Sequence, residues 1–198
     1  MHLTLFKTPI IHHILWAIAR LFLLCMGWKC IGERPEHKKY IAIAAPHTSN
    51  WDFPILFACA LKLRLGSYWM GKDSLFKPLY GWFFKWLGGI PVDRSKSNNV
   101  VEQMAQIYTN ADALCVGIAP EATRKANIKW KSGFYHIAVQ AKIPILIAYI
   151  DYEKKEAGIG EFFEPTGDFD ADMKYIQEFY RGWVACHPDR FAGEYLDQ

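Results

Sequence analysis

The chain has 198 residues, of which 52% are hydrophobic and 22% are charged, with a net charge of +3. This length suits one domain with a substantial core, and the composition excludes a disordered chain. The odd number of five cysteines, without a Cys-x-x-Cys pair, argues against a disulfide framework. No Cys/His spacing is typical of a zinc site, so we expect no structural metal.

From residue 10 to residue 28 the chain is almost wholly apolar, interrupted by His12, His13 and Arg20. A spanning helix needs about 20 apolar residues, and a central arginine costs roughly 2.5–3.5 kcal/mol on the insertion scale. A spanning helix is therefore possible but disfavoured. The small-x-small cleavage site of a signal peptide is absent, so we expect no removed signal peptide. We expect an apolar helix that lies in the membrane interface, with packing against the domain as the alternative.

Beyond this segment, short apolar runs alternate with helical patterns. The predicted strands are 40–45, 68–70, 90–92, 114–118 and 144–150, and the predicted helices are 51–63, 75–87, 99–108 and 134–142. This alternation predicts the α/β class: a single domain with a mostly parallel sheet flanked by helices. Ligands bind such sheets beyond the carboxyl ends of the strands, and the candidate motifs fall there.

Charge is distributed unevenly along the chain. Residues 62–96 hold seven basic and two acidic residues, and residues 124–142 hold five basic residues and no acid. From residue 151 onward, twelve acidic residues oppose five basic ones. The two basic segments indicate an anionic partner on one face, for which anionic lipid, a phosphorylated substrate and nucleic acid all qualify; an ordinary solvated surface is the alternative.

The first motif is the run His47-Thr-Ser-Asn-Trp-Asp52, directly after a predicted strand. Acyl transfer to an alcohol needs a base for the hydroxyl proton, and neutral histidine suits that task near neutral pH. A carboxylate partner fixes the tautomer of such a base. The two side chains can meet if His47 lies in a loop and Asp52 folds back from the first helical turn. The alternative is a loop histidine beside a capping aspartate.

Three further segments also follow or begin predicted strands. In Gly89-Ile-Pro-Val-Asp-Arg94, the arginine could bind a phosphate beside a helix start, or simply pair with Asp93 on the surface. The run Pro120-Glu-Ala-Thr-Arg124 offers a carboxylate, a hydroxyl and a guanidinium on one turn. The last segment, Ile143-Pro-Ile145, opens a core strand.

The four segments resemble, in order and approximate spacing, the motifs of the glycerolipid acyltransferase family, which includes bacterial 1-acyl-glycerol-3-phosphate acyltransferases. They stand here as PHTSNWD, GGIPVDR, APEATR and KIPIL, and the intervening GKDSLFKPLYGW is similar to the family's linker. The implied site residues are the catalytic His47 and Asp52, the phosphate-binding Lys72, Arg94 and Arg124, and the pocket residues Glu121 and Thr123.

The resemblance also implies a reaction. The donor would be an acyl thioester of coenzyme A or acyl carrier protein, used as a co-substrate without a bound cofactor. The acceptor would be a membrane lysophospholipid, and the protein would work in phospholipid biosynthesis on the cytoplasmic face of the membrane, as a peripheral or monotopic protein. Residues 1–30 are then an apolar N-terminal helical segment and residues 31–198 the acyltransferase domain.

The sequence departs from the family pattern at three positions. Pro46 stands for the usual Asn, Ala119 for Phe and Ala122 for Gly; alanine is unfavourable at position 122 if that residue needs a positive φ. The two changes in the third motif motivate an alternative, a non-catalytic membrane- or lipid-binding protein on the same scaffold, against which the intact His47/Asp52 pair argues. A soluble phosphate- or nucleic-acid-binding module is a third reading. The apolar N-terminus argues against it, and we expect no nucleic-acid partner.

Overall fold

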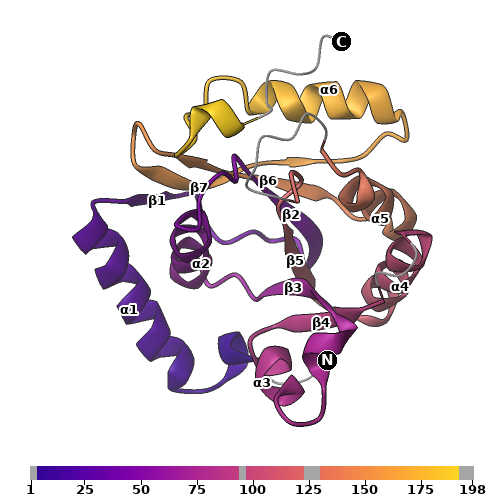
Figure 1. Cartoon of the computed structure of the whole chain (residues 1–198), viewed down its shortest axis with the longest axis horizontal. Coiled ribbons are helices and arrows are strands. Elements are labelled where there is room, and N and C mark those ends of the chain that lie inside the picture. The colour runs from indigo at the N-terminus through magenta and orange to yellow at the C-terminus, as the bar shows by residue number, and fades with distance from the viewer. Residues whose placement is uncertain (1–3, 94–96, 123–129, 192–198) are drawn as a thin grey trace.

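The computed structural model describes residues 4–93, 97–122 and 130–191, which form one α/β domain around a seven-stranded sheet (Figure 1). The strands are β1 (Lys29–Ile31), β2 (Lys39–Ala45), β3 (Ser67–Lys72), β4 (Gly89–Val92), β5 (Leu114–Ile118), β6 (Ile145–Asp151) and β7 (Glu156–Phe163). Their order in the sheet is β1-β7-β6-β2-β5-β3-β4. Neighbouring strands pair parallel except β6 and β7, so the predicted α/β class and mostly parallel sheet are confirmed.

Helices cover both faces of the sheet, with α1 and α2 on one side and α4 and α5 on the other (Figure 1). The helices are α1 (Ile11–Met26), α2 (Asp52–Lys62), α3 (Gly81–Trp86), α4 (Ser97–Asn110), α5 (Gly133–Ala141) and α6 (Phe169–Phe179). Short 3-10 turns lie at η1 (Leu5–Lys7), η2 (Asp73–Phe76) and η3 (Pro188–Arg190). The largest buried cluster joins the central strands to α4, α5 and α6.

The two faces of β2 differ in side-chain size. Ile41 and Ile43 are fully buried in the cluster beneath α4, α5 and α6. Because alternate residues of a strand point to opposite faces, Ala42 and Ala44 face the α2 side. Methyl groups at these two positions leave space between the sheet and α2.

Helix α1 packs along α2, and Trp16 Nε1 donates to the Lys62 carbonyl at 3.1 Å. Its outer face is apolar and exposed at Ile14, Ile18 and Leu21, which are spaced as one face of a helix. Gly27 ends the helix in the left-handed conformation. Within the described residues, no helix combines the length and apolarity needed to cross a membrane.

The helix predicted at 75–87 is wrong in part, because the structure divides this segment into η2 and α3. Pro78 prevents continuation, since a residue before proline avoids the helical region, and Lys77 is extended, with φ −59° and ψ 153°. The chain then turns back so tightly that a Cβ on Gly81 would clash with the Phe76 backbone. The result is a compact aromatic turn followed by a short helix.

Candidate functional site

His47 and Asp52 meet at the carboxyl end of β2. The chain leaves the strand through a cis Ala45–Pro46 bond, and His47 lies in the loop before α2. The Asp52 side chain folds back over this loop, so that its Oδ2 accepts hydrogen bonds from the Thr48 and Ser49 amides, both at 2.8 Å. The same oxygen lies 3.2 Å from His47 Nδ1. The predicted contact between the two side chains is therefore present.

The surroundings of Asp52 favour its charged form. Burial by itself raises the pKa of this carboxyl, which is fully buried, but hydrogen bonds from His47, Tyr152 and the Ser49 amide together lower it below its usual value. Tyr152 donates its hydroxyl to Oδ1 at 2.6 Å. A carboxylate at Nδ1 holds the proton there and leaves Nε2 of His47 as the atom that can accept another proton.

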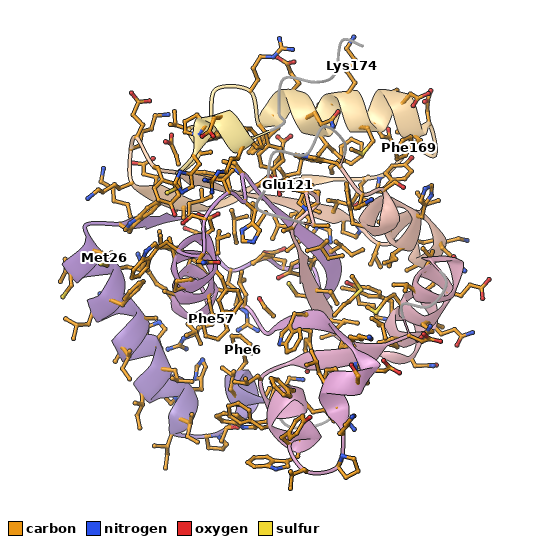
Figure 2. All side chains as sticks on the ribbon, viewed as in Figure 1. Phe6, Met26, Phe57, Glu121, Phe169 and Lys174 are labelled. Atoms are coloured by element: carbon orange, nitrogen blue, oxygen red, sulfur yellow. The ribbon has the colours of Figure 1, made fainter. Side chains whose placement is uncertain are left out.

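Glu121 supports the same loop from the turn after β5. Its Oε1 accepts the His47 backbone N–H at 2.8 Å, and the side chain is 3% exposed. Burial raises the pKa of Glu121 to about 7, against the lowering effect of backbone hydrogen bonds that include the one from His47. In Figure 2, Glu121 lies near the ends of the central strands. The next residue, Ala122, has φ +57°, so this position does require the left-handed conformation.

An apolar cavity of about 480 Å³ extends from His47 between α2 and the sheet. Phe53, Phe57 and Ala60 of α2 lie in its wall, and the small side chains of Ala42 and Ala44 form part of its floor. None of the described residues that line it is Asp, Glu, Lys or Arg. The cavity therefore suits a hydrocarbon chain whose polar end lies beside the imidazole.

A second cavity of about 350 Å³ lies on the opposite side of β3 and β5. Its wall includes Val100 of α4, Phe134 and Ile137 of α5, and the Ala122 methyl. Lys131 also lines it, and the Lys131 amide donates to the Pro120 carbonyl at 2.8 Å. This cavity combines apolar walls with an exposed lysine whose backbone is bonded to the turn that carries Glu121.

The structure brings three of the predicted site residues into one hydrogen-bonded group: His47, Asp52 and Glu121. Lys72 ends β3, is exposed and lines neither cavity. The other three, Arg94, Thr123 and Arg124, lie outside the described residues. Sequence reasoning missed Tyr152, which no motif marks. It noted Lys131 only as part of a basic segment. No cluster of three or more potential metal ligands occurs among the residues that the structure describes.

Comparisons with known proteins concern the family and the fold of the chain. A family model described as Acyltransferase matches residues 29–151. The 1-acyl-sn-glycerol-3-phosphate acyltransferase of Saccharomyces cerevisiae is 29% identical over an alignment of 149 residues, and the match covers 68% of this chain and 48% of the yeast protein. The chain thus spans about half the length of that relative. The crystal structure of the 1-acyl-sn-glycerophosphate acyltransferase PlsC from Thermotoga maritima superposes with a TM-score of 0.59 at 17% identity, covering 88% of this chain and 82% of that one, and so shares its fold.

Proposed function

Because this chain belongs to the Acyltransferase family, we propose that it transfers a fatty acyl group from an acyl thioester to the free hydroxyl of a lysophospholipid such as 1-acyl-glycerol-3-phosphate. The observation that carries this proposal is the His47–Asp52 contact of 3.2 Å, with His47 in the wall of an apolar cavity. A base beside a hydrocarbon-sized space is what acyl transfer requires. Phospholipid biosynthesis is the process in which such a product is used.

In the proposed reaction, Nε2 of His47 takes the proton of the acceptor hydroxyl as its oxygen attacks the thioester carbonyl. The tetrahedral intermediate collapses, the carbon–sulfur bond breaks, and the leaving thiolate takes the proton from the imidazolium. Asp52 stabilises the positive charge that His47 carries between these two steps. No covalent acyl-enzyme is needed, since the acceptor oxygen is itself the nucleophile.

The donor's acyl chain would occupy the apolar cavity on the α2 side. Each methylene removed from water contributes about 0.8 kcal/mol, so a long chain would bind there without any charged partner. Its thioester would then lie beside His47, which lines the cavity. Coenzyme A and acyl carrier protein both present such a thioester, and we propose either as co-substrate.

The acceptor's glycerol phosphate would bind on the other side of the sheet end, where Lys131 lines the second cavity. An ammonium group there can pair with a phosphate. Lys72, Arg94 and Arg124 remain predicted phosphate ligands, and Thr123 and Glu121 remain predicted pocket residues. The loop that carries His47, between β2 and α2, would lie between the two substrates in this arrangement.

We further propose that α1 and the η2–α3 segment contact the cytoplasmic face of a membrane. Besides the outer face of α1, Leu79 and Trp82 are 83% and 68% exposed. Trp86 of α3 donates to the Thr8 hydroxyl at 3.0 Å, which ties α3 to the segment that leads into α1. Lys77 and Lys85 lie in the same segment, and bases beside exposed aromatic side chains favour an anionic lipid surface.

The test of the catalytic proposal is a transfer assay with labelled acyl-coenzyme A or acyl carrier protein and a panel of lysolipids. His47→Ala should lower the rate by about 10²–10⁴-fold and leave the far-UV circular dichroism unchanged, because His47 lies in a loop. Asp52→Asn should also lower the rate. Lys174→Glu on α6, distant from the site in Figure 2, serves as the matched control. Wild-type lipid binding without transfer would favour the non-catalytic alternative.

The membrane proposal has a separate test in vesicle co-sedimentation over a series of anionic lipid fractions. The double variant Ile14→Glu/Ile18→Glu places charge on the exposed face of α1 and should weaken binding, whereas Lys174→Glu should have little effect. Binding that ignores both the α1 charges and the lipid composition would remove the membrane proposal and leave the catalytic one standing.

A further inference from the structure

We propose that Tyr152 is a positioning residue, which fixes the Asp52 carboxylate against His47 and is itself held in place by Trp28 at the end of α1. The inference rests on the proposed function, because it assigns a role within that catalytic group. Tyr152 lies directly after β6, one hundred positions beyond Asp52 in the sequence, and belongs to none of the family-like motifs.

The two carboxylate oxygens of Asp52 have separate partners. Oδ2 accepts from the Thr48 and Ser49 amides and contacts His47, whereas Oδ1 accepts the Tyr152 hydroxyl at 2.6 Å. Rotation of the carboxylate would break bonds to both sets of donors. Without the tyrosine hydroxyl, the amides and the imidazole would hold one oxygen only, and the buried second oxygen would lose this strong donor. The hydroxyl therefore fixes the plane in which Asp52 meets His47.

Tyr152 is held from two further directions. Its backbone N–H donates to the Val184 carbonyl at 2.9 Å. Its ring packs edge-on against Trp28, with the ring centroids 5.0 Å apart and the planes at 85°. Burial and the neighbouring Asp52 raise the pKa of Tyr152, so the hydroxyl keeps its proton across the working range of pH.

Trp28 connects this contact to α1. The indole is 8% exposed, and the Trp28 amide donates to the Leu23 carbonyl at 2.8 Å, directly after the left-handed Gly27 that ends the helix. The C-terminal end of α1 is thus two side chains away from Asp52. A change in the position of α1 at this end would act on the catalytic pair through Trp28 and Tyr152.

Other titratable groups near the pair must be considered in any pH measurement. Glu121, on the turn after β5, accepts a hydrogen bond from the His47 amide, and the charge of Cys186, in the segment after α6, affects the pKa of Tyr152. In the same segment, the His187 amide donates to the Thr48 hydroxyl at 3.1 Å. These groups are the same in the wild type and in a Tyr152 variant, so a difference between the two profiles reports on the lost hydroxyl.

The decisive variant is Tyr152→Phe, which keeps the ring and its contact with Trp28 but removes the hydroxyl. We expect kcat to fall roughly tenfold, as for loss of one hydrogen bond to a charged group, while KM for donor and acceptor changes less than twofold. Without the hydroxyl, the Asp52 carboxylate can turn away from His47 and stabilises the imidazolium less. The acid limb of the pH profile of kcat/KM should therefore move to lower pH.

Tyr108→Phe is the matched control, because it removes a buried hydroxyl that donates to the Tyr40 carbonyl at 2.8 Å, away from the site. It should leave both kcat and the pH profile unchanged. Trp28→Ala should reproduce part of the loss in kcat, and Trp28→Phe should restore most of it. A Tyr152→Phe enzyme with wild-type kcat and pH profile would overturn the proposal.

An NMR titration of the His47 ring in wild type and in Tyr152→Phe separates this inference from the acyltransferase proposal. A midpoint that moves downward in the variant supports the positioning role even if no acyl transfer is detected, in which case only the proposed function fails. If wild type transfers acyl groups and neither the midpoint nor kcat falls in the variant, the positioning role fails alone.

Discussion

The two cavities on opposite sides of β3 and β5 have different chemistry, although the same strands form part of both walls. The cavity beside α2 is lined mostly by apolar side chains, with His47, Ser67 and Tyr68 among them, whereas the cavity beside α4 and α5 has Lys131 and not His47. Trp69, Gly117, Ile118 and Ala119 contribute to both. The sheet thus separates a mostly apolar cavity from a cavity with a lysine in its wall, and the turn after β5 lies between them. We expect changes on one side to affect one substrate and to spare the other.

The largest expected effect comes from closing the cavity beside α2. Ala60 lies seven residues along α2 from Phe53, or roughly 10 Å at 1.5 Å per residue, so it marks a deeper part of the cavity. Ala60→Phe should lower kcat/KM for long acyl donors by about 100-fold and for short donors much less, because overpacking excludes the chain end. A donor series of increasing chain length measures this.

Ala60→Ser is the control, since it changes polarity with little change in volume. It should retain the wild-type order of chain lengths. KM for the lysolipid should be nearly the same in both variants. A uniform loss over all donor lengths in Ala60→Phe would mean that the acyl chain binds elsewhere.

A smaller effect is expected on the other side of the sheet. Lys131→Ala removes the cation from the second cavity and should raise KM for a phosphorylated acceptor about tenfold, with little change in KM for the donor. Lys131→Arg should keep most of the activity, because the positive charge remains. An equal effect on donor and acceptor would show that Lys131 does not distinguish the two substrates.

Much of this arrangement could be predicted from sequence because it depends on local pattern. The Tyr40–Ala45 run, its proline and the spacing from His47 to Asp52 all act within a few residues, and the predicted strand, loop and contact are present. Strands β1 and β7 and helix α6 were not predicted. β1 has three residues, and β7 contains two glycines, so neither shows a clear two-residue alternation.

The cavities and the hydrogen bond from the Tyr152 hydroxyl to Asp52 could not be predicted in this way. Ala42 and Ala44 read as ordinary strand residues, and they make space only because α2 lies opposite them. Tyr152 reaches Asp52 from the end of a neighbouring strand, across one hundred residues of sequence. Such features depend on tertiary placement, whereas periodicity describes one element at a time.

Glu121, on the turn after β5, offers a test of how the free energy of unfolding depends on pH. The pKa of Glu121 is raised to about 7 from an ordinary value of 4.5, so the folded state binds this proton more tightly than the unfolded state. The resulting stabilisation is complete below pH 4.5 and is lost as the pH rises toward 7. Between pH 5 and 8, the free energy of unfolding of wild type, measured in urea, should fall by roughly 2–3 kcal/mol relative to that of Glu121→Gln. Parallel pH dependence in the two proteins would contradict this.

The smallest expected effect concerns Ala122, whose φ of +57° suits glycine better than any residue with a Cβ. Ala122→Gly should stabilise the protein by about 1 kcal/mol and raise Tm by roughly 2–4 °C. It also removes a methyl group from the wall of the cavity that contains Lys131, so the enzyme should accept a bulkier acceptor head group. Calorimetry and an acceptor panel measure the two effects.

Lys142→Gly separates strain from selectivity. Lys142 has φ +52° at the end of α5, is exposed and lines neither cavity. Both glycine variants should gain stability, since each relieves the same backbone conformation, but only Ala122→Gly should change the order of acceptors. If the two variants gain stability equally and keep the wild-type order, Ala122 is strained without acting on the acceptor. If Ala122→Gly instead changed the preference for donor chain length, the sheet would not separate the two substrates.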